Sequence, residues 1–336
     1  MKKLNKYLLL ISIILITNLS ANQIDVAEIV TSFDERPGNV AISKEGKVYL
    51  SIHPFLNPDT KVVELTLNGK ITAYPNSEYS KGKGSINKSI LGIKVDTSGN
   101  LWMLDLHKNQ FVVWNTKEDR LKKIIKIPND VLKPASFLQD FVIDEKRNRA
   151  IIADMTQRDL KSAPEPAFVV VDTISGKSKR IAQNHPSMMP DFKGGFGLDP
   201  ISIDPEFNWI YFGAVHGKKV YRVPAESFSS EQSVVENIKE YGPKSYSDGI
   251  IADAQGNVYI TDIEKNAIGL TTTAKYKIIA SLPKGQSWPD GFAIGNDGYV
   301  YVTVNQLDKV AAFNNGKEQG KSPYLLVRIK AISNIK

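Results

Sequence analysis

Three aspartates, Asp199, Asp248 and Asp290, stand at the same place in a repeated pattern, five residues before the residue that opens a polar turn. Gln139 holds this place in another copy, and Asp140 follows it directly. Carboxylates that converge repel one another, which raises their pKa values unless a cation or hydrogen-bond donors compensate. Such oxygen ligands suit Ca²⁺ or another divalent cation. The pattern predicts a ligand-binding site in which the three aspartates could also hold a metal.

A second interpretation of these aspartates is purely local. Asp248 and Asp290 each precede a glycine, in "SDG" and "PDG". An aspartate in such a turn commonly accepts hydrogen bonds from nearby backbone N–H groups. For each single residue both interpretations stay open, while for the set as a whole we favour a binding site.

A further set of residues follows nine or ten positions after each turn opener. His53 and Asn305 are binding candidates from this set, and His53 and His216 are conceivable general bases. The carboxylates of the set are expected to hold the next loop, because a carboxylate at a strand end can accept its backbone N–H groups. The whole set is His53, Asp105, Asp154, Ala214, Asp262 and Asn305.

Trp288 directly precedes the "PDG" that contains Asp290. Its indole could stack on a flat ligand or pack between neighbouring elements, and we include it among the binding candidates. The 4 histidines show no metal-ligand spacing, and neither a nucleophile elbow nor a glycine-rich phosphate loop is present. The catalytic residues therefore stay unassigned, and whether the protein is an enzyme stays open.

The pattern that carries these residues occurs six times. Each copy has four apolar-rich residues, a polar turn and an aromatic strand-like run, as in "SDGIIADAQGNVYITD" (247–262). Successive turn openers are 53, 48, 60, 49 and 42 residues apart. The openers are Ser43, Asp96, Asp144, Asp204, Asp253 and Gly295.

Each copy is predicted to form a β-hairpin, because two runs of residues that favour strands flank a tight turn. Further strand-like stretches lie between the copies, such as "AFVVVDTISGKSKRIA" (167–182). A period of about 40–50 residues with four strands is typical of a propeller blade. A β-sandwich explains many strands but not six copies of one hairpin. We predict an all-β, six-bladed β-propeller that forms a single domain over residues 22–336.

This fold would bring the candidate residues together. The innermost strand of each blade lines the central channel, and the next strand runs back antiparallel to the same mouth. The residues before each turn opener and those after it should therefore meet at one end of the channel.

The N-terminus has the layout of a secretory signal peptide. Lys2, Lys3 and Lys6 precede an apolar run of about ten residues, and a polar stretch ends at Ala21. The run is shorter than the ~20 residues that span a bilayer. We predict a signal peptide over residues 1–21, a secreted or periplasmic protein, and no membrane span after cleavage.

The composition of the chain limits the classes of partner that it can bind. The net charge of +7 is scattered along the chain, so it lacks the concentrated basic surface that nucleic-acid binding needs. The chain has no cysteine, which excludes disulfides and thiolate chemistry. We expect a monomer that takes a small-molecule ligand and binds no nucleic acid.

The chain resembles the Yellow / major royal jelly protein family, in its bacterial branch. The resemblance lies in "ERPGNVAISKEGKVYLSIH", "QDFVIDEKRNRAIIAD", "WIYFGAVHGKKVYRVP" and "YSDGIIADAQGNVYITDIEKNAI". It implies a secreted six-bladed propeller that binds small molecules, such as amines, in or near the channel. Some insect members are linked to dopachrome conversion, which implies a tautomerase or isomerase as one alternative.

The chain also resembles, more distantly, the gluconolactonase/regucalcin propellers. In that group a Glu, an Asn and an Asp hold a divalent metal at the channel mouth, and another Asn contacts the substrate. The resemblance matches the metal-binding Asp to Asp248, the metal-binding Asn to Asp199 and the substrate Asn to Gln139. The Glu falls near Gly38, with Glu35 three residues upstream. It thus implies an altered metal site.

Two classes of function follow. The protein is either a binding protein that captures a small cationic or aromatic molecule at the channel mouth, or an enzyme. The enzyme would be a divalent-metal lactonase or esterase-type hydrolase, in which the ion polarises a carbonyl, or a dopachrome-type isomerase. We favour binding, because no complete catalytic set can be named.

Overall fold

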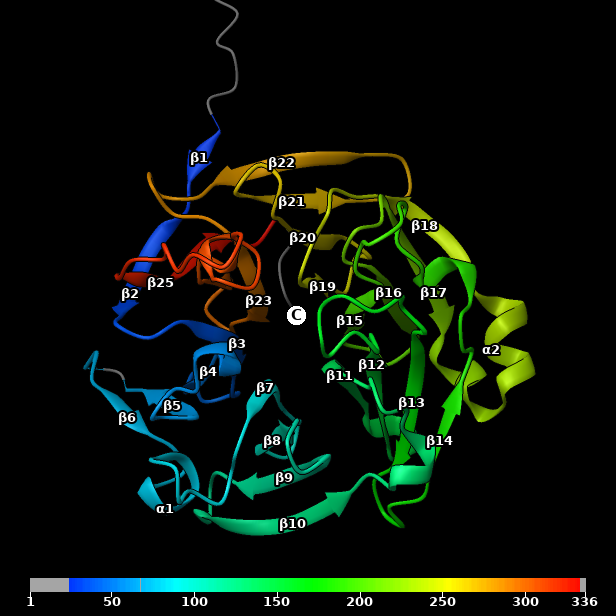
Figure 1. Ribbon diagram of the computed structural model, residues 1–336, viewed down its shortest axis with the longest axis horizontal. Helices are drawn as coiled ribbons and strands as arrows, with labels where there is room; N and C mark the ends of the chain where they lie inside the picture. Colours follow the sequence, from blue (N-terminus) through cyan, green and yellow to red (C-terminus); the bar gives the residue numbers. More distant parts are fainter. Residues whose placement is uncertain (1–23, 67, 333–336) are drawn as a thin grey trace, which may run out of the picture.

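The computed structural model describes residues 24–66 and 68–332, and strands predominate in this part of the chain. The strands form six separate sheets. In Figure 1 these sheets stand around a common axis. The prediction of an all-β, six-bladed β-propeller is therefore confirmed. The predicted signal peptide lies outside the described residues.

The first three blades follow one another along the chain, each with its strands in antiparallel order. Blade 1 contains β3 (Pro37–Ile42), β4 (Val48–Ile52), β5 (Val62–Leu65) and β6 (Ile71–Ala73). Blade 2 contains β7 (Ile90–Val95), β8 (Asn100–Asp105), β9 (Gln110–Asn115) and β10 (Arg120–Lys126). Blade 3 contains β11 (Leu138–Asp144), β12 (Arg149–Asp154), β13 (Ala167–Asp172) and β14 (Ser178–Ile181).

The remaining blades complete the ring. Blade 4 contains β15 (Leu198–Ile203), β16 (Trp209–Ala214), β17 (Lys219–Pro224) and β18 (Lys239–Pro243). Blade 5 contains β19 (Ile250–Ala252), β20 (Val258–Asp262), β21 (Ala267–Thr271) and β22 (Tyr276–Ser281), with β1 (Asp25–Val26) parallel to β22. Blade 6 contains β23 (Pro289–Ile294), β24 (Tyr299–Val304), β25 (Tyr324–Lys330) and β2 (Glu28–Phe33).

Blade 6 joins the two ends of the described chain. Its outermost strand, β2, comes before blade 1 in sequence and pairs antiparallel with β25. Glu28 lies opposite Arg328 in this pairing, and their side chains form a two-armed ion pair with N–O distances of 2.6 and 3.0 Å. The ring is thus closed by backbone hydrogen bonds within blade 6, between a strand from the start of the described chain and one from its end.

Helices are few and peripheral. The described residues contain α1 (Ser77–Ser80) and α2 (Glu231–Asn237), and α2 lies at the outer rim of blade 4 in Figure 1. Within the described ranges no helix is long and apolar enough to cross a membrane.

The repeated hairpin has a local cause. In blade 2 the turn opener Asp96 accepts hydrogen bonds from the backbone N–H groups of Ser98 and Asn100, at 3.0 and 2.8 Å. Asp253 binds the N–H groups of Gln255 and Asn257 in the same way, both at 2.9 Å. A carboxylate that satisfies the turn's own donors fixes where the first strand ends and the second begins. The register of each hairpin follows from this turn.

The blades pack face to face through aromatic side chains. Phe111 of blade 2 contacts Phe141 of blade 3 edge to face, with ring centroids 4.8 Å apart, and Phe168 meets Phe212 between blades 3 and 4 at 5.0 Å. All four rings are fully buried. Such pairs contribute about 0.5–1.5 kcal/mol beyond the area they bury. This packing holds the inner strands at fixed positions around the axis.

The inner strands carry a bulge at the same place. In β11, Leu138 pairs with Asp154 and Phe141 with Ile152, so three steps on the inner strand match two on its neighbour. The same shift occurs in β3, β7, β15 and β23. A bulge redirects side chains, and these bulges contain Gln139, Asp140, Asp199 and Asp290 of the predicted set, whereas Asp248 lies just before β19.

The inner strands approach one another closely at the bulges. A Cβ atom at Gly249 would lie 2.0 Å from the backbone oxygen of Asp290 in the next blade. We therefore predict that Gly249→Ala lowers the free energy of unfolding by about 2–3 kcal/mol, because the backbones of blades 5 and 6 must separate. Gly84→Ala, where a Cβ meets nothing within 4 Å, is the matched control. Equal denaturation midpoints for the two variants would contradict the prediction.

Candidate functional site

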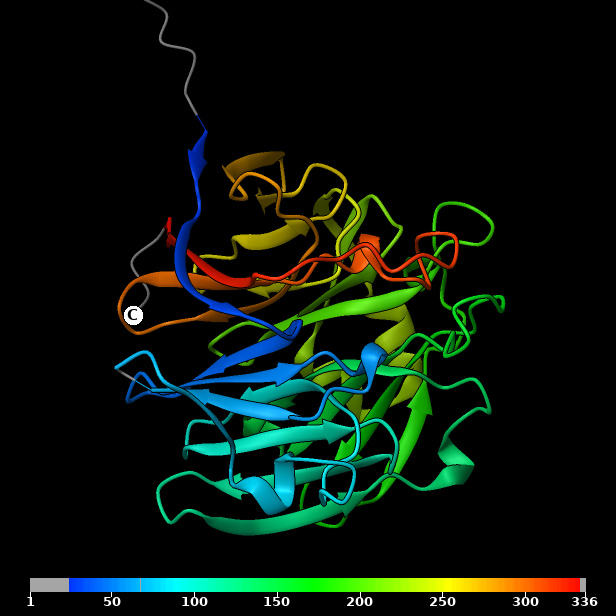
Figure 2. The same ribbon diagram turned by 60° about the vertical axis from the view of Figure 1, so that its left-hand side comes forward.

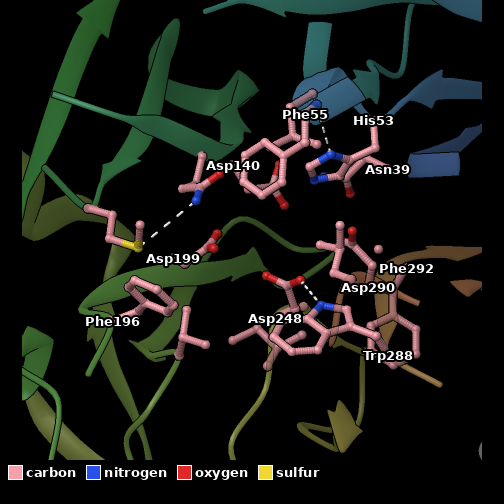
Figure 3. Close-up of a pocket in the computed structure, with 18 of the residues that line it drawn as sticks. Asn39, His53, Phe55, Asp140, Phe196, Asp199, Asp248, Trp288, Asp290 and Phe292 are labelled. Atoms are coloured by element: carbon pink, nitrogen blue, oxygen red, sulfur yellow. Dashed lines mark hydrogen bonds between the residues drawn. The ribbon is translucent and has the colours of Figure 1, made fainter. Parts of the chain in front are cut away.

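The predicted acidic residues meet at one mouth of the central channel. Figure 3 shows Asp140, Asp199, Asp248 and Asp290 pointing into one cavity, three of them from inner strands and Asp248 from the segment just before β19. Gln139 lines the same cavity, as do Trp288 and His53. The cavity measures about 40 Å³, which is room for about three water molecules. The arrangement that the repeat predicted is therefore present.

Each aspartate has partners, but a single one is paired with a cation. Asp140 accepts a hydrogen bond from Lys94 Nζ at 2.9 Å. Asp248 accepts one from the Trp288 indole N–H, and Asp290 accepts one from the side-chain amide of Asn305, both at 2.5 Å. Among the described ion pairs, none involves Asp199, Asp248 or Asp290.

This imbalance of charge shifts the proton affinity of the carboxyl groups. Burial, followed by the charges of Asp248, Asp140 and Asp290, raises the pKa of Asp199 well above its ordinary value of 3.8. Burial and the charge of Asp248 raise the pKa of Asp290 in the same way. Asp199 and Asp248 share a hydrogen bond that raises the pKa of Asp199. Both carboxyl groups of this pair therefore hold a proton more readily than an exposed aspartate does.

Aromatic rings cover the acidic cavity. Phe313 stacks on Trp288 with centroids 5.7 Å apart and planes inclined by 8°. It also contacts Phe196 at 5.6 Å and Phe55 at 6.0 Å. We call these four residues the aromatic lid. Its members come from loops that extend on one side of the disc in Figure 2, including the orange-to-red loop between β24 and β25.

Trp288 is held in an unusual backbone conformation. Its φ angle is 56°, in the left-handed region that bulky residues rarely adopt. The side-chain oxygen of Asn266 accepts a hydrogen bond from the Trp288 backbone N–H at 3.1 Å. Strained residues of this kind cluster at functional sites. Here the conformation coincides with an indole that contacts both Asp248 and Phe313.

The two binding candidates from the second strand of the hairpin lie in different positions. His53 lines the cavity, and burial lowers its pKa to about 3, so the imidazole is neutral at pH 7. Its Nδ1 accepts the Phe55 N–H at 3.4 Å, which leaves the ring proton on Nε2 as a donor. Asn305 lies behind Asp290 rather than on the cavity wall. Its side chain supports the site.

The other carboxylates of that set hold loops, as expected. Asp105 accepts the backbone N–H groups of Lys88, His107 and Lys108. Asp154 and Asp262 are likewise fully buried and hydrogen-bonded to nearby backbone and side chains. His216 accepts the Phe196 N–H at 2.8 Å and stacks on that ring, so it positions the aromatic lid.

Two polar side chains of the cavity were not among the candidates. Asn39 lies beside Gly38 in the bulge of β3, and its side chain lines the cavity in Figure 3. The sequence analysis missed Lys94, although its charge sets it apart from the residues at the same place in the other copies of the repeat. Six residues stand two positions before a turn opener, one in each copy of the repeat, and Lys94 is the charged one among them. The other members are Ala41, Val142, Ser202, Ile251 and Ala293.

The residues present do not complete a divalent-metal site. In the described part of the chain, no group of three or more His, Cys, Asp or Glu side chains could hold a metal ion. A side chain at position 38 is also excluded, since a Cβ there would lie 2.8 Å from Ser51 Oγ. Glu35 accepts the Asp59 N–H instead and does not line the cavity. We derive no metal-dependent step from this geometry.

The fold and the position of the cavity define a class: a six-bladed β-propeller with a polar site at one mouth of its channel. Within that class, the sequence model of the major royal jelly protein family matches residues 88–335. The chain belongs to this family. No protein of curated function matches its sequence significantly.

Solved structures share the fold at low identity. A luciferin-regenerating enzyme aligns with a TM-score of 0.65 and 13% identity, over 91% of this chain and 95% of that one. Regucalcin from Agrobacterium tumefaciens, a calcium-binding protein, gives 0.58 and 14%, over 91% and 95%. A gluconolactonase from Xanthomonas campestris gives 0.57 and 9%, over 90% and 91%. At these identities the likeness establishes the fold alone.

Proposed function

We propose that this protein captures a small organic cation at the acidic mouth of its channel, with the cationic group among Asp199, Asp248 and Asp290. The observation that carries the proposal is the imbalance of charge. Four aspartates, of which Asp199 and Asp290 are buried and Asp140 and Asp248 are partly buried, face one cavity that a single lysine, Lys94, lines. Isolated buried carboxylates are costly, so they either take up protons or acquire a cation.

The aromatic lid favours an organic cation over a metal ion. Cations bind to the faces of aromatic rings, most strongly to tryptophan, with about 0.5–2 kcal/mol for each contact. Trp288 donates its indole N–H to Asp248, and Phe313, which stacks on Trp288, lines the same cavity. An ammonium group could thus meet carboxylates on one side and ring faces on the other.

The size of the cavity limits how such a ligand would lie. A volume of about 40 Å³ admits an ammonium group with a few waters but not a whole aromatic amine. The rest of the ligand must lie among the rings of the aromatic lid. Phe55, Phe196 and Phe313 are each half-buried and carried by loops, so they can separate to admit it.

Calorimetry with three matched compounds tests the proposal. Phenethylamine, which is a cation at pH 7, should bind with one site, while 2-phenylethanol and phenylacetate should not bind measurably. The three compounds share a phenyl ring and differ in charge, so the comparison isolates the carboxylates. Equal binding of the alcohol and the amine would refute the proposed role of charge.

The lid residue Phe313 gives a specific prediction. Phe313→Ala should weaken phenethylamine binding about tenfold, because it removes the ring that joins Trp288, Phe55 and Phe196. Phe192→Ala is the control: this ring packs on His216 and Tyr246 and does not line the cavity. An unchanged dissociation constant in Phe313→Ala would show that the lid does not contact the ligand.

A second candidate function is proton transfer on the captured molecule. It is favoured by the Asp199–Asp248 pair, which shares a proton inside the cavity and could take one from a ligand and return it. Loss of dopachrome colour on mixing with the protein would support an isomerase. Binding without turnover would leave capture as the function.

We also propose that the chain is exported as a monomer to the periplasm or the exterior. The support is the arrangement of Lys2, Lys3, the apolar run and Ala21. Fractionation of expressing cells and N-terminal sequencing should find a mature chain that begins at Asn22. A cytoplasmic protein that retains Met1 would refute export.

A further inference from the structure

The channel has a second cavity at the opposite mouth, where the inner strands end. It measures about 390 Å³, within the range of small-molecule sites. The residue directly before each turn opener contributes to its wall. Together these residues form what we call the aliphatic collar: Ile42, Val95, Ile143, Ile203, Ala252 and Ile294.

The polar groups on this wall are already satisfied within the protein. Ser202 Oγ accepts the Ala252 N–H at 3.0 Å, and Asn296 donates to the Lys44 carbonyl at 2.7 Å. Glu145 accepts the Thr97 N–H at 2.9 Å. Asp204 and Asp253 accept backbone N–H groups of their own turns. Water inside the collar would therefore find few free partners, and water in a cavity needs about two to four.

The two cavities are neighbours but differ in chemistry. Lys94, Ile250 and Phe292 line both and so form the wall between them. The ammonium group of Lys94 is directed to Asp140, on the acidic side. No other cationic side chain lines the second cavity in the described residues. An anionic ligand would thus gain little here, and the carboxylates of Asp204 and Asp253 are already engaged by their own turns, whereas an apolar ligand would replace poorly bonded water.

We propose that the aliphatic collar binds one small, uncharged, largely hydrocarbon molecule, independently of the cation at the other mouth. The volume fits a compact molecule rather than a protein segment, because an α-helix with its side chains is about 10–12 Å across. The site would make the protein a carrier of two chemically different ligands.

Titration with the neutral fluorophore N-phenyl-1-naphthylamine tests this proposal. The fluorophore should bind with one saturable site and a rise in emission. Ile251→Glu should weaken binding at least tenfold, because a carboxylate in the wall would have to lose its water. Ile174→Glu is the matched control, since Ile174 lies in a hairpin turn with 77% of its surface exposed. It should bind as tightly as the wild type.

A second variant keeps the test decisive if Ile251→Glu does not fold. Ile203→Asn changes a half-buried collar residue and should also weaken the fluorophore's binding. Saturable binding that both folded variants of the cavity wall retain would overturn the proposal. So would displacement of the fluorophore by phenethylamine, which would place it under the aromatic lid, or the absence of any saturable binding.

Discussion

A chain that begins at Asp34 is expected to fail to fold into a closed ring. It lacks β2, which covers β25 and its buried residues Leu325, Leu326 and Val327. It also lacks Phe33, which packs on Val40 of blade 1 and so links the first and last blades. Losing one buried phenylalanine costs about 3–5 kcal/mol, and whole domains are stable by about 5–15 kcal/mol. The loss of the complete strand should therefore exceed what the fold can tolerate.

Circular dichroism and size-exclusion chromatography measure this outcome. The truncated chain should lose its cooperative unfolding transition and elute as aggregate or expanded monomer. A chain that begins at Asn22 is the control, because it keeps β1 and β2. A truncated protein with a native-like transition and elution volume would show that blade 6 is stable with three strands.

The second large effect concerns Asp199 and Asp248. Asp199→Asn together with Asp248→Asn should weaken phenethylamine binding at least about 30-fold, because removing buried charged partners costs about 2–5 kcal/mol. The same variant should be more stable than the wild type without ligand at pH 7, on the order of 1–4 kcal/mol, because two carboxyl groups that lack a cationic partner are removed. Binding and stability are thus expected to change in opposite directions.

The pH dependence of this gain follows from the pKa shifts. Folding raises the pKa of Asp199 and of Asp248 above 3.8. Their stabilising contribution is therefore complete below about pH 3.8 and is lost as the pH rises through the folded-state values. His53 acts oppositely: its pKa is lowered to about 3, so stability falls as the pH drops below 6.5. The contribution of His53 is the same in both proteins, so the difference in the free energy of unfolding between the double variant and the wild type reports on the two aspartates.

Urea denaturation across this pH range measures the difference. The stability gain of the variant should be small near pH 4 and should increase towards pH 7. Asp130→Asn, at an exposed aspartate outside the cavity, controls for the general effect of lost charge. A gain that does not vary with pH would contradict the raised pKa values of the two aspartates, and unchanged amine binding in the double variant would contradict their role in holding a cation.

The six-bladed fold could be predicted because its signal is repeated. Turn openers such as Asp96 and Asp253 recur with the same flanking strands, so each copy supports the others. The convergence of Asp199, Asp248 and Asp290 then follows from symmetry alone. No contact between blades had to be known.

The site residues that the sequence analysis missed are not determined by the repeated pattern. Asn39 faces the cavity because of a bulge, and the position of a bulge depends on pairing between strands. Phe196 and Phe313 lie in long loops that differ from blade to blade, so no periodicity places them. The role of Asn305 behind Asp290 depends on side-chain packing. Only the three-dimensional structure shows these features.

The pairing of β2 with β25 also sets an order of events during synthesis. Glu28 leaves the ribosome about 300 residues before its partner Arg328, so the early strand must wait for nearly the whole polypeptide. Contacts this distant in sequence slow folding. Until the last strand emerges, the nascent molecule stays open. If the chain is exported as we propose, this delay would postpone closure of the ring until nearly the whole chain has crossed the membrane.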